Sequence, residues 1–185
     1  MHSYLGLGRR TALLITGLLL VAGTTIGLQP ADAASAPPVI HFKTGKTHTV
    51  YSRATAKKFL KGTPKAFEYY AAKLGGAARS YTVKQAKTDP SFKDCIPSSG
   101  AQVKIYQGGY AIANVGDCAG VLEYWTNRRK GGTKSGPWHT IFKTQDMPQC
   151  AALKTYKFPS AVAGTQCITK TEKVIGYHQA WQRIG

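Results

Sequence analysis

The chain has 185 residues and carries 25 Lys and Arg against 8 Asp and Glu, which gives a formal net charge of +17. That length suits one domain with a real hydrophobic core. No fold requires so high a charge, so it favours polyanionic partners such as nucleic acid, an anionic wall polymer or lipid headgroups; simple solubility is the alternative. The small number of carboxylates leaves little material for acid–base catalysis.

Residues 1–33 have the layout of a secretory signal peptide. Arg9 and Arg10 precede a mostly apolar stretch over residues 11–27, and Ala31-Asp32-Ala33 then offers small residues to a signal peptidase. We therefore expect cleavage after Ala33, with a retained membrane anchor as the alternative. The two arginines also permit the twin-arginine route, although the residues after them favour the general one.

Export would leave residues 34–185 as an extracellular, secreted protein, either free or held at the cell wall by its charge. Loss of the two arginines and Asp32 lowers the net charge by one, from +17 to +16. We expect a monomer without a stable membrane anchor.

All four cysteines lie in this exported part: Cys95, Cys118, Cys150 and Cys167. An even number of cysteines in an exported chain predicts two disulfides, for which three pairings exist. We favour pairing between neighbours, Cys95 with Cys118 and Cys150 with Cys167. Each bond would close a loop of roughly 20 residues, worth about 3 kcal/mol. No two cysteines are close in sequence, which argues against zinc, and we predict no metal site and no cofactor.

The first expected elements are an arm and two helices. Residues 34–52 predict an extended linker or arm, or a weak hairpin after Val39. Ser52 is a suitable N-cap for a short helix through Leu60. A second helix is expected from Thr63 and Pro64, with an apolar face formed by Phe67, Tyr70, Ala71 and Leu74. Gly75-Gly76 is expected to end it.

The second half predicts mainly strands. After a loop over residues 88–100, alternating segments joined by glycine turns indicate an antiparallel meander with strands at 102–106, 110–115, 121–126 and 138–143. A short helix over 147–154 is expected after Asp146, followed by a turn at 159–164. The apolar spacing over 170–184 fits a strand or a helix.

These elements predict an α+β fold, in which N-terminal helices pack on one face of a curved antiparallel meander sheet stapled by two disulfides. Residues 53–185 would form a single domain. The order of helices followed by a meander suggests a cystatin-like or nuclear-transport-factor-2-like arrangement, an analogy that says little about function.

Part of the meander also resembles the C-terminal half of small exported actinobacterial proteins of uncharacterised activity. The resemblance covers Gly109 to Cys167. It rests on Tyr110-Ala-Ile-Ala, on the strand Trp138-His-Thr-Ile-Phe, and on the segments Thr144–Cys150 and Phe158–Cys167. In such proteins a tryptophan strand leads into a cysteine-bounded helical cap. The resemblance implies export and the Cys150–Cys167 bond, and it implies no activity.

The densest basic cluster is the expected turn between the last two strands. It contains four cations, Arg128, Arg129, Lys130 and Lys134, and two glycines whose amides would be free to approach an anion. Tyr124, Trp125 and Trp138 flank the turn and are candidates for stacking on bases or sugars. The alternative is a solvated hairpin tip with its aromatic residues in the core.

A second basic set lies on the two N-terminal helices. Its alternative is an ordinary polar helix surface, and we expect it to matter less than the turn because its cations are spread around cylinders. The set consists of Arg53, Lys57, Lys58, Lys61, Lys65 and Lys73.

The best catalytic candidates are Glu123 and His139, on adjacent strands of one predicted hairpin. If paired positions sum to 262, the two residues face each other, and Glu123, His139 and Arg128 would suit cleavage of an RNA phosphodiester. If they sum to 263, His139 faces Tyr124 and the pair is separated. No nucleophile elbow or phosphate-binding loop occurs.

The sequence thus supports three hypotheses. The first is a non-enzymatic exported binding protein for an anionic wall polymer or nucleic acid. The second is a secreted ribonuclease or toxin-like enzyme built on Glu123 and His139. The third is an exported inhibitor of another protein. Whether the chain is an enzyme stays open, and binding is favoured over catalysis.

Overall fold

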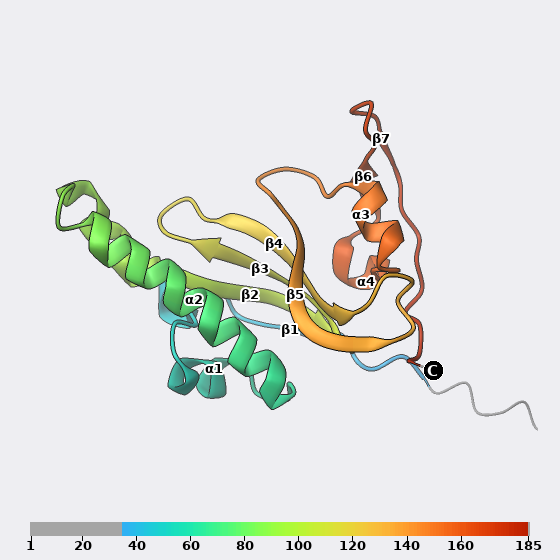
Figure 1. The fold of residues 1–185 in the computed structure, drawn as a ribbon, viewed down its shortest axis with the longest axis horizontal. Coiled ribbons are helices and arrows are strands. Elements are labelled where there is room, and N and C mark those ends of the chain that lie inside the picture. Colours follow the sequence, from blue (N-terminus) through green and yellow to red (C-terminus); the bar gives the residue numbers. More distant parts are fainter. Residues whose placement is uncertain (1–34, 185) are drawn as a thin grey trace, which may run out of the picture. The chain divides into compact units, whose positions relative to one another are not determined.

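The computed structural model describes residues 35–184, and these residues form one compact unit. Its centre is a five-stranded antiparallel sheet in the order β1-β2-β3-β4-β5, with a separate two-stranded sheet of β6 and β7 (Figure 1). The α+β class with a meander sheet is therefore confirmed. The predicted signal peptide lies outside the described residues.

Four strands of the sheet were expected from sequence, and each extends beyond its expected range at one or both ends. The turn between β2 and β3 holds Gly108 and Gly109 at φ values of 43° and 103°, a conformation that favours glycine, which explains the tight hairpin there. The strands are β1 (Ile40–His41), β2 (Gly100–Gln107), β3 (Tyr110–Gly116), β4 (Val121–Arg128), β5 (Ser135–Thr144), β6 (Gln166–Ile168) and β7 (Val174–Gly176).

The N-terminal arm belongs to this sheet. Its β1 pairs with β2, and Val50 and Ala101 exchange two backbone hydrogen bonds of 2.8 Å. The segment that we expected as a linker therefore supplies an edge strand, with a one-turn 3-10 helix η1 (Lys46–His48) after it.

The helices are longer or more numerous than expected. The loop predicted over residues 88–100 contains the 3-10 helix η2, and the helix expected after Asp146 begins later, at Cys150. Beyond β7, residues 177–184 have no regular secondary structure. The helices are α1 (Arg53–Phe59), α2 (Lys65–Gln85), η2 (Pro90–Ser98), α3 (Cys150–Thr155) and α4 (Ser160–Ala163).

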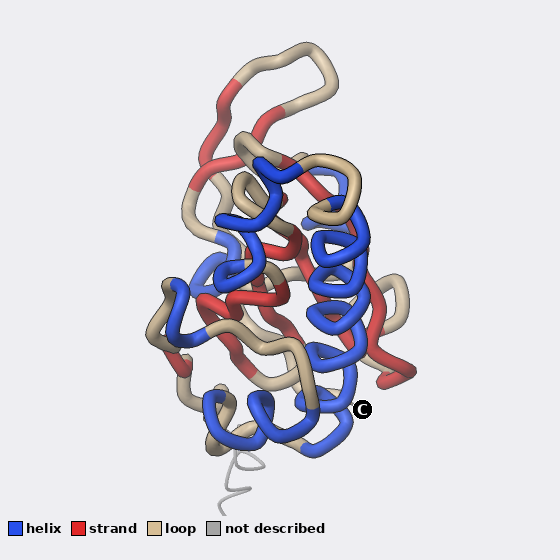
Figure 2. Tube along the Cα trace, turned by 90° about the vertical axis from the view of Figure 1, so that its left-hand side faces the viewer, coloured by secondary structure: helices blue, strands red, loops and turns tan. Residues whose placement is uncertain are grey.

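The predicted end of the second helix at Gly75-Gly76 is wrong, because α2 continues for nine residues beyond Gly76, to Gln85. The glycines serve a packing contact instead. A Cβ atom at Gly75 would collide with the carbonyl oxygen of Val50 and lie 2.8 Å from the amide nitrogen of Ala101. The missing side chain thus lets α2 approach the backbone of the Val50–Ala101 bridge. Figure 2 shows the long helix running alongside the strands.

The helix-facing side of the sheet forms the first core. Phe67 of α2 is fully buried and its ring contacts Tyr106, Trp125 and Trp138 at centroid distances of 4.9, 6.1 and 4.7 Å. Tyr70 and Leu74 are partly buried against the same cluster. The apolar face predicted for this helix is therefore the one that packs on the sheet.

The opposite side of the sheet is also covered, which corrects our expectation of helices on one face. Tyr110 and Tyr124 project to this side and pack with Leu153 of α3, Val162 of α4 and the buried Phe158 between these helices. Figure 1 shows α1 and α2 on one side of the sheet and α3 and α4 on the other. The C-terminal third thus supplies the second layer.

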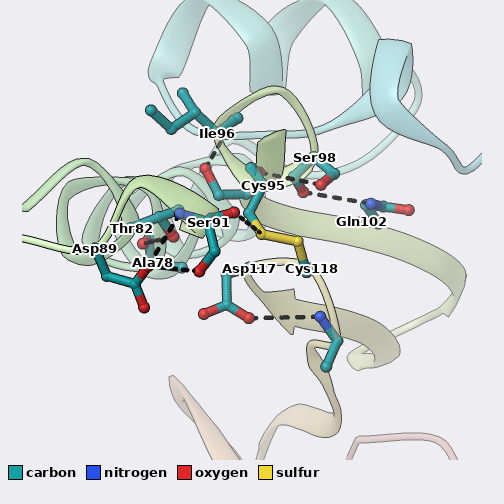
Figure 3. The surroundings of a disulfide bond; sticks show 12 residues. Ala78, Thr82, Asp89, Ser91, Cys95, Ile96, Ser98, Gln102, Asp117 and Cys118 are labelled. Carbon is teal, nitrogen blue, oxygen red and sulfur yellow. Dashed lines mark hydrogen bonds between the residues drawn. A yellow bond between two sulfur atoms is a disulfide. The ribbon is translucent and has the colours of Figure 1, made fainter. Parts of the chain in front are cut away.

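Both expected disulfides are present, and all four cysteines are paired. Cys95 of η2 is bonded to Cys118 in the β3–β4 turn, which ties the segment after α2 to the sheet (Figure 3). Cys150 at the start of α3 is bonded to Cys167 of β6. Two disulfides indicate an oxidising environment outside the cytoplasm.

Candidate functional site

The candidate site is a groove between α1 and α2 with a volume of about 560 Å³. Three cations line it, together with an exposed tyrosine and one carboxylate. The lining residues are Arg53, Lys57, Thr63, Lys65, Glu68 and Tyr69. Three of the six members of the predicted helix set therefore meet in one place.

Local sequence explains why these two helices face each other. The Ser52 side chain accepts a hydrogen bond from the Thr55 amide, and the Thr55 hydroxyl in turn accepts one from the Ser52 amide, which completes a capping box at the start of α1. Leu60 then ends α1 and is 1 % exposed in the core, so the chain turns back at once into α2. The cations outside this buried contact are left on the solvent side.

Helical spacing aligns the side chains of the groove. Arg53 and Lys57 are four residues apart on α1, and Lys65, Tyr69 and Lys73 follow the same spacing on α2, so each set shares one helix face. Lys73 lines a smaller adjacent hollow of about 270 Å³, which shares Arg53 and Tyr69 with the groove. The two hollows thus form one basic surface, which we call the α1–α2 groove.

Two tyrosines each lie under an arginine: Tyr69 lines the groove, and Tyr51 lies outside its lining, next to Ser52 of the smaller hollow. The guanidinium carbon of Arg53 is 4.7 Å from the ring centroid of Tyr69, and that of Arg79 is 4.2 Å from the ring centroid of Tyr51. Tyr69 and Tyr51 keep 53 % and 39 % of their surface exposed. A further bond holds Arg79 in place, because its Nη1 donates to the Ile96 carbonyl oxygen at 2.7 Å.

Lys58 and Lys61 belong to the predicted helix set but do not line the groove. Both are exposed, and the Lys58 ammonium lies 5.2 Å from the ring centroid of Phe59. The helix set is therefore divided between a gathered group and two solvated cations.

The predicted basic turn is present between β4 and β5, but its backbone is engaged. Arg129, Lys130 and Lys134 are exposed. The Gly131 amide, expected to be free for an anion, donates to the Thr155 carbonyl at 2.8 Å, and the Gly132 amide donates to the Arg129 carbonyl at 3.0 Å. The turn is thus docked on the end of α3 through the amides that an anion would need.

Arg128, the fourth cation of the predicted turn, is only 1 % exposed. It is therefore not part of the solvent-facing surface that the other three cations form. Its Nη1 donates to the Gly132 carbonyl at 3.1 Å and its Nη2 to the Gly108 carbonyl at 2.8 Å. Its guanidinium carbon lies 5.4 Å from the Tyr110 ring and 5.3 Å from the Trp181 ring. Burial lowers the pKa of Arg128. Its role is to hold the hairpin ends and the C-terminal tail together.

The aromatic residues expected to stack beside the turn are in the cores. Tyr124 is 4 % exposed and Trp125 is fully buried. Trp138 is partly buried against Phe67 on the α2 side of the sheet. The alternative interpretation of these three residues, as core aromatics, is the one that the structure supports.

Glu123 and His139 do not face each other. Glu123 pairs with Lys143 and His139 with Thr126, so neither of the two registers that we considered occurs at these two residues. The register shifts between Tyr124 and Trp125, which inserts an extra residue into β5 and changes the face on which the neighbouring β5 residues lie. Sequence periodicity cannot reveal such a bulge.

The two side chains also lie on opposite faces of the sheet. Glu123 Oε2 accepts bonds of 2.9 Å from Trp125 Nε1 and Thr140 Oγ1 on the α2 side. The His139 ring lies on the other side, 5.5 Å from the Tyr156 ring. Glu123, His139 and Arg128 are thus not brought together into one catalytic group.

Glu123 instead anchors a polar network under α2. Its Oε1 is 2.6 Å from the Lys143 ammonium, and Thr140 is bonded at 2.9 Å to the Tyr70 hydroxyl. Burial raises the pKa of Tyr70. Every polar end of the network has a partner, so the network ties α2 to β4 and β5 and serves stability.

Within residues 35–184, no group of three or more His, Cys, Asp and Glu side chains is arranged to hold a metal ion. In the same part of the chain, none of the helices combines the length and the apolarity needed to cross a bilayer.

Neither the protein-family models, nor the curated proteins, nor the solved structures contain a match to this chain. The resemblance to exported actinobacterial proteins therefore stays a prediction. Function has to be inferred from the geometry of the groove.

The residues that sequence reasoning missed are Tyr69 in the groove and the Tyr51–Arg79 pair beside it. Tyr69 stands four residues from both Lys65 and Lys73, on the polar face of a predicted helix. A tyrosine at that position cannot pack into the core, so the sequence alone could have indicated an exposed aromatic residue among the lysines. Tyr51 and Arg79 had no such signal, because a fold must bring residues 51 and 79 together.

Proposed function

We propose that the protein is exported and binds an anionic polymer through the α1–α2 groove. The observation that carries the proposal is the convergence of Arg53, Lys57 and Lys65 on one hollow with a single carboxylate, Glu68. The signal-like N-terminus and the two disulfides support export.

The charge balance around the groove supports an anionic ligand. Four side chains of positive charge, including Lys73, surround two connected hollows, and the whole chain carries +17. Cations gathered at that density repel one another unless a polyanion or counterions compensate them. A polyanion that displaces the counterions gains the entropy of their release.

The groove is favoured over the basic turn for a physical reason. Its cations lie on two facing helices beside a concavity that a polymer chain can enter. The turn presents three exposed cations, with its fourth buried and its glycine amides already bonded. A localised site therefore fits the groove better.

The test compares two variants that each lose three charges. One is Arg53→Gln/Lys57→Gln/Lys65→Gln in the groove, and the other is Arg129→Gln/Lys130→Gln/Lys134→Gln in the turn. Binding to heparin and to a nucleic acid is measured from about 50 to 300 mM salt. The groove variant should lose affinity and flatten the log–log salt slope by about two, and the turn variant should change the slope by less than one.

A single substitution should instead raise the affinity for polyanions. Glu68→Gln removes the carboxylate of the groove and should raise affinity severalfold at low salt. Asp94→Asn removes an exposed carboxylate of η2 outside the groove and controls for net charge. The localised site is refuted if the two triple variants lower affinity equally per charge removed. It is also refuted if the two single variants change affinity equally, because both results indicate a diffuse field of charge.

A further inference from the structure

We infer that the ligand of the α1–α2 groove is single-stranded nucleic acid, whose bases stack on Tyr69 and Tyr51 while its phosphates contact the surrounding cations. The inference rests on the proposed function and names the class of polymer. It starts from two exposed tyrosines, Tyr69 in the groove and Tyr51 beside it, whose presence a charged surface alone does not explain.

A polymer recognised only by its charge requires cations and no aromatic surface. Here two tyrosine rings stand exposed at the edge of the basic surface, each stacked on a guanidinium group. Every nucleobase has a flat π face, so a tyrosine accepts any base, and arginine adds a cation–π contact. A groove of cations with interleaved aromatic rings is the usual design of sequence-tolerant single-strand binding.

The geometry makes the two rings a pair. Tyr51 and Arg53 stand on either side of Ser52, while their partners Arg79 and Tyr69 are ten residues apart on α2. Ten helical residues span about 15 Å but end on a face of α2 turned by about 80°, so a flexible strand that contacts both platforms must wind partly around the helix. Lys73 lies four residues after Tyr69 on the same face of α2, where it can contact a phosphate next to a base stacked on Tyr69.

The Tyr51–Arg79 platform is held in place before any ligand arrives. Arg79 is held by the Ile96 carbonyl, and the Tyr51 amide donates to the Thr55 hydroxyl at 3.0 Å, within the same cap that starts α1. Rigid aromatic rings lose little conformational entropy on binding, which favours stacking over a mobile surface.

A duplex fits this arrangement poorly. Bases in a duplex are already stacked and paired, so the rings would meet only the backbone. The preference should therefore be for unpaired strands over duplex at equal phosphate number, and for intact strands over strands without bases.

The experiment measures fluorescence anisotropy of four labelled ligands with the intact protein. The ligands are a thymidine oligonucleotide, an abasic strand with the same number of phosphates, a duplex, and a poly(glycerol phosphate) that represents wall polymer. We expect the intact strand to bind about tenfold or more tightly than the abasic strand, because stacking contributes a factor of this order for each base.

Substitutions locate the effect. Tyr69→Leu should remove most of the difference between intact and abasic strands, whereas Tyr81→Leu should preserve that difference. Tyr81→Leu is the matched control, since Tyr81 is on the same helix and 56 % exposed but lies outside the groove. Circular dichroism melting verifies that both variants are folded.

The outcomes separate this inference from the proposed function. Equal binding of intact and abasic strands, with both still dependent on the groove cations, would overturn base stacking and leave polyanion binding standing. Tighter binding of poly(glycerol phosphate) than of the oligonucleotide would overturn it in favour of wall polymer. No binding of any polyanion at low salt would overturn both. The comparison of ligands with the unaltered protein needs no variant to fold.

Discussion

Replacement of Gly75 by alanine tests the packing of α2 on the sheet. Helix propensity alone predicts that Gly75→Ala stabilises the protein by about 1 kcal/mol, since glycine is unfavourable inside a helix. The structure predicts the opposite sign. The new Cβ atom would collide with the Val50 carbonyl oxygen and lie 2.8 Å from the Ala101 nitrogen, where ordinary contact begins at 3.4 Å.

The magnitude depends on which atoms must move. The two contacted atoms belong to the Val50–Ala101 bridge, whose two hydrogen bonds are both 2.8 Å long. Overpacking of this kind costs about 1–3 kcal/mol, and weakening the two bonds adds about 1 kcal/mol each. After the gain in propensity, we expect a net loss of about 2–4 kcal/mol.

The assay is urea unfolding followed by circular dichroism, with linear extrapolation to water. Gly76→Ala is the matched control, because a Cβ atom there meets only the Tyr51 carbonyl oxygen at 3.2 Å. That variant should stay within about 1 kcal/mol of the unaltered protein. If Gly75→Ala is as stable as the unaltered protein or more so, the close approach of α2 to the bridge is refuted.

Four further predictions concern stability and the disulfides. Phe67→Ala should cost about 3–5 kcal/mol in the same urea assay, and a loss below about 1 kcal/mol would mean that its face of α2 is exposed. Thiol titration of the denatured, unreduced protein should find no reactive group, and two or more per chain would contradict the disulfides. Arg128→Ala should cost about 2–4 kcal/mol because it removes two buried hydrogen bonds, to the Gly108 and Gly132 carbonyls, and a buried side chain. Arg129→Ala should change stability by less than about 0.5 kcal/mol, and similar values for the two variants would contradict the burial of Arg128. Burial raises the pKa of Tyr124 to about 12. The folded protein therefore keeps a proton that the unfolded chain loses, and stability should fall above about pH 10 by up to about 1.4 kcal/mol per pH unit; no fall between about pH 10 and 11 would refute this burial effect.

The sequence by itself determined the elements whose signals are local. Alternating apolar residues between glycine turns predicted β2, β3, β4 and β5, because a strand's pattern and its hairpin turns are written within a few residues. The capping box at Ser52 and the apolar face around Phe67 were readable for the same reason. The disulfide pairing followed from neighbouring cysteines that close short loops.

The tertiary structure decided what depends on residues far apart in the chain. Gly75 looked like a helix end because glycine propensity is a local signal, and only the backbone of Val50 and Ala101 shows why the helix continues. The register around Glu123 depends on a bulge in β5, which no alternation predicts.

The same reason separates the two basic clusters. A run of cations in sequence made the turn at Arg128 the stronger candidate, yet the fold buries that arginine between Tyr110 and Trp181. The cations that do gather, on α1 and α2, are dispersed in sequence and meet because Leu60 and Phe67 bury the facing sides of both helices in one core. Charge and composition are properties of the sequence, but the position of each charge depends on which side chains the core takes in.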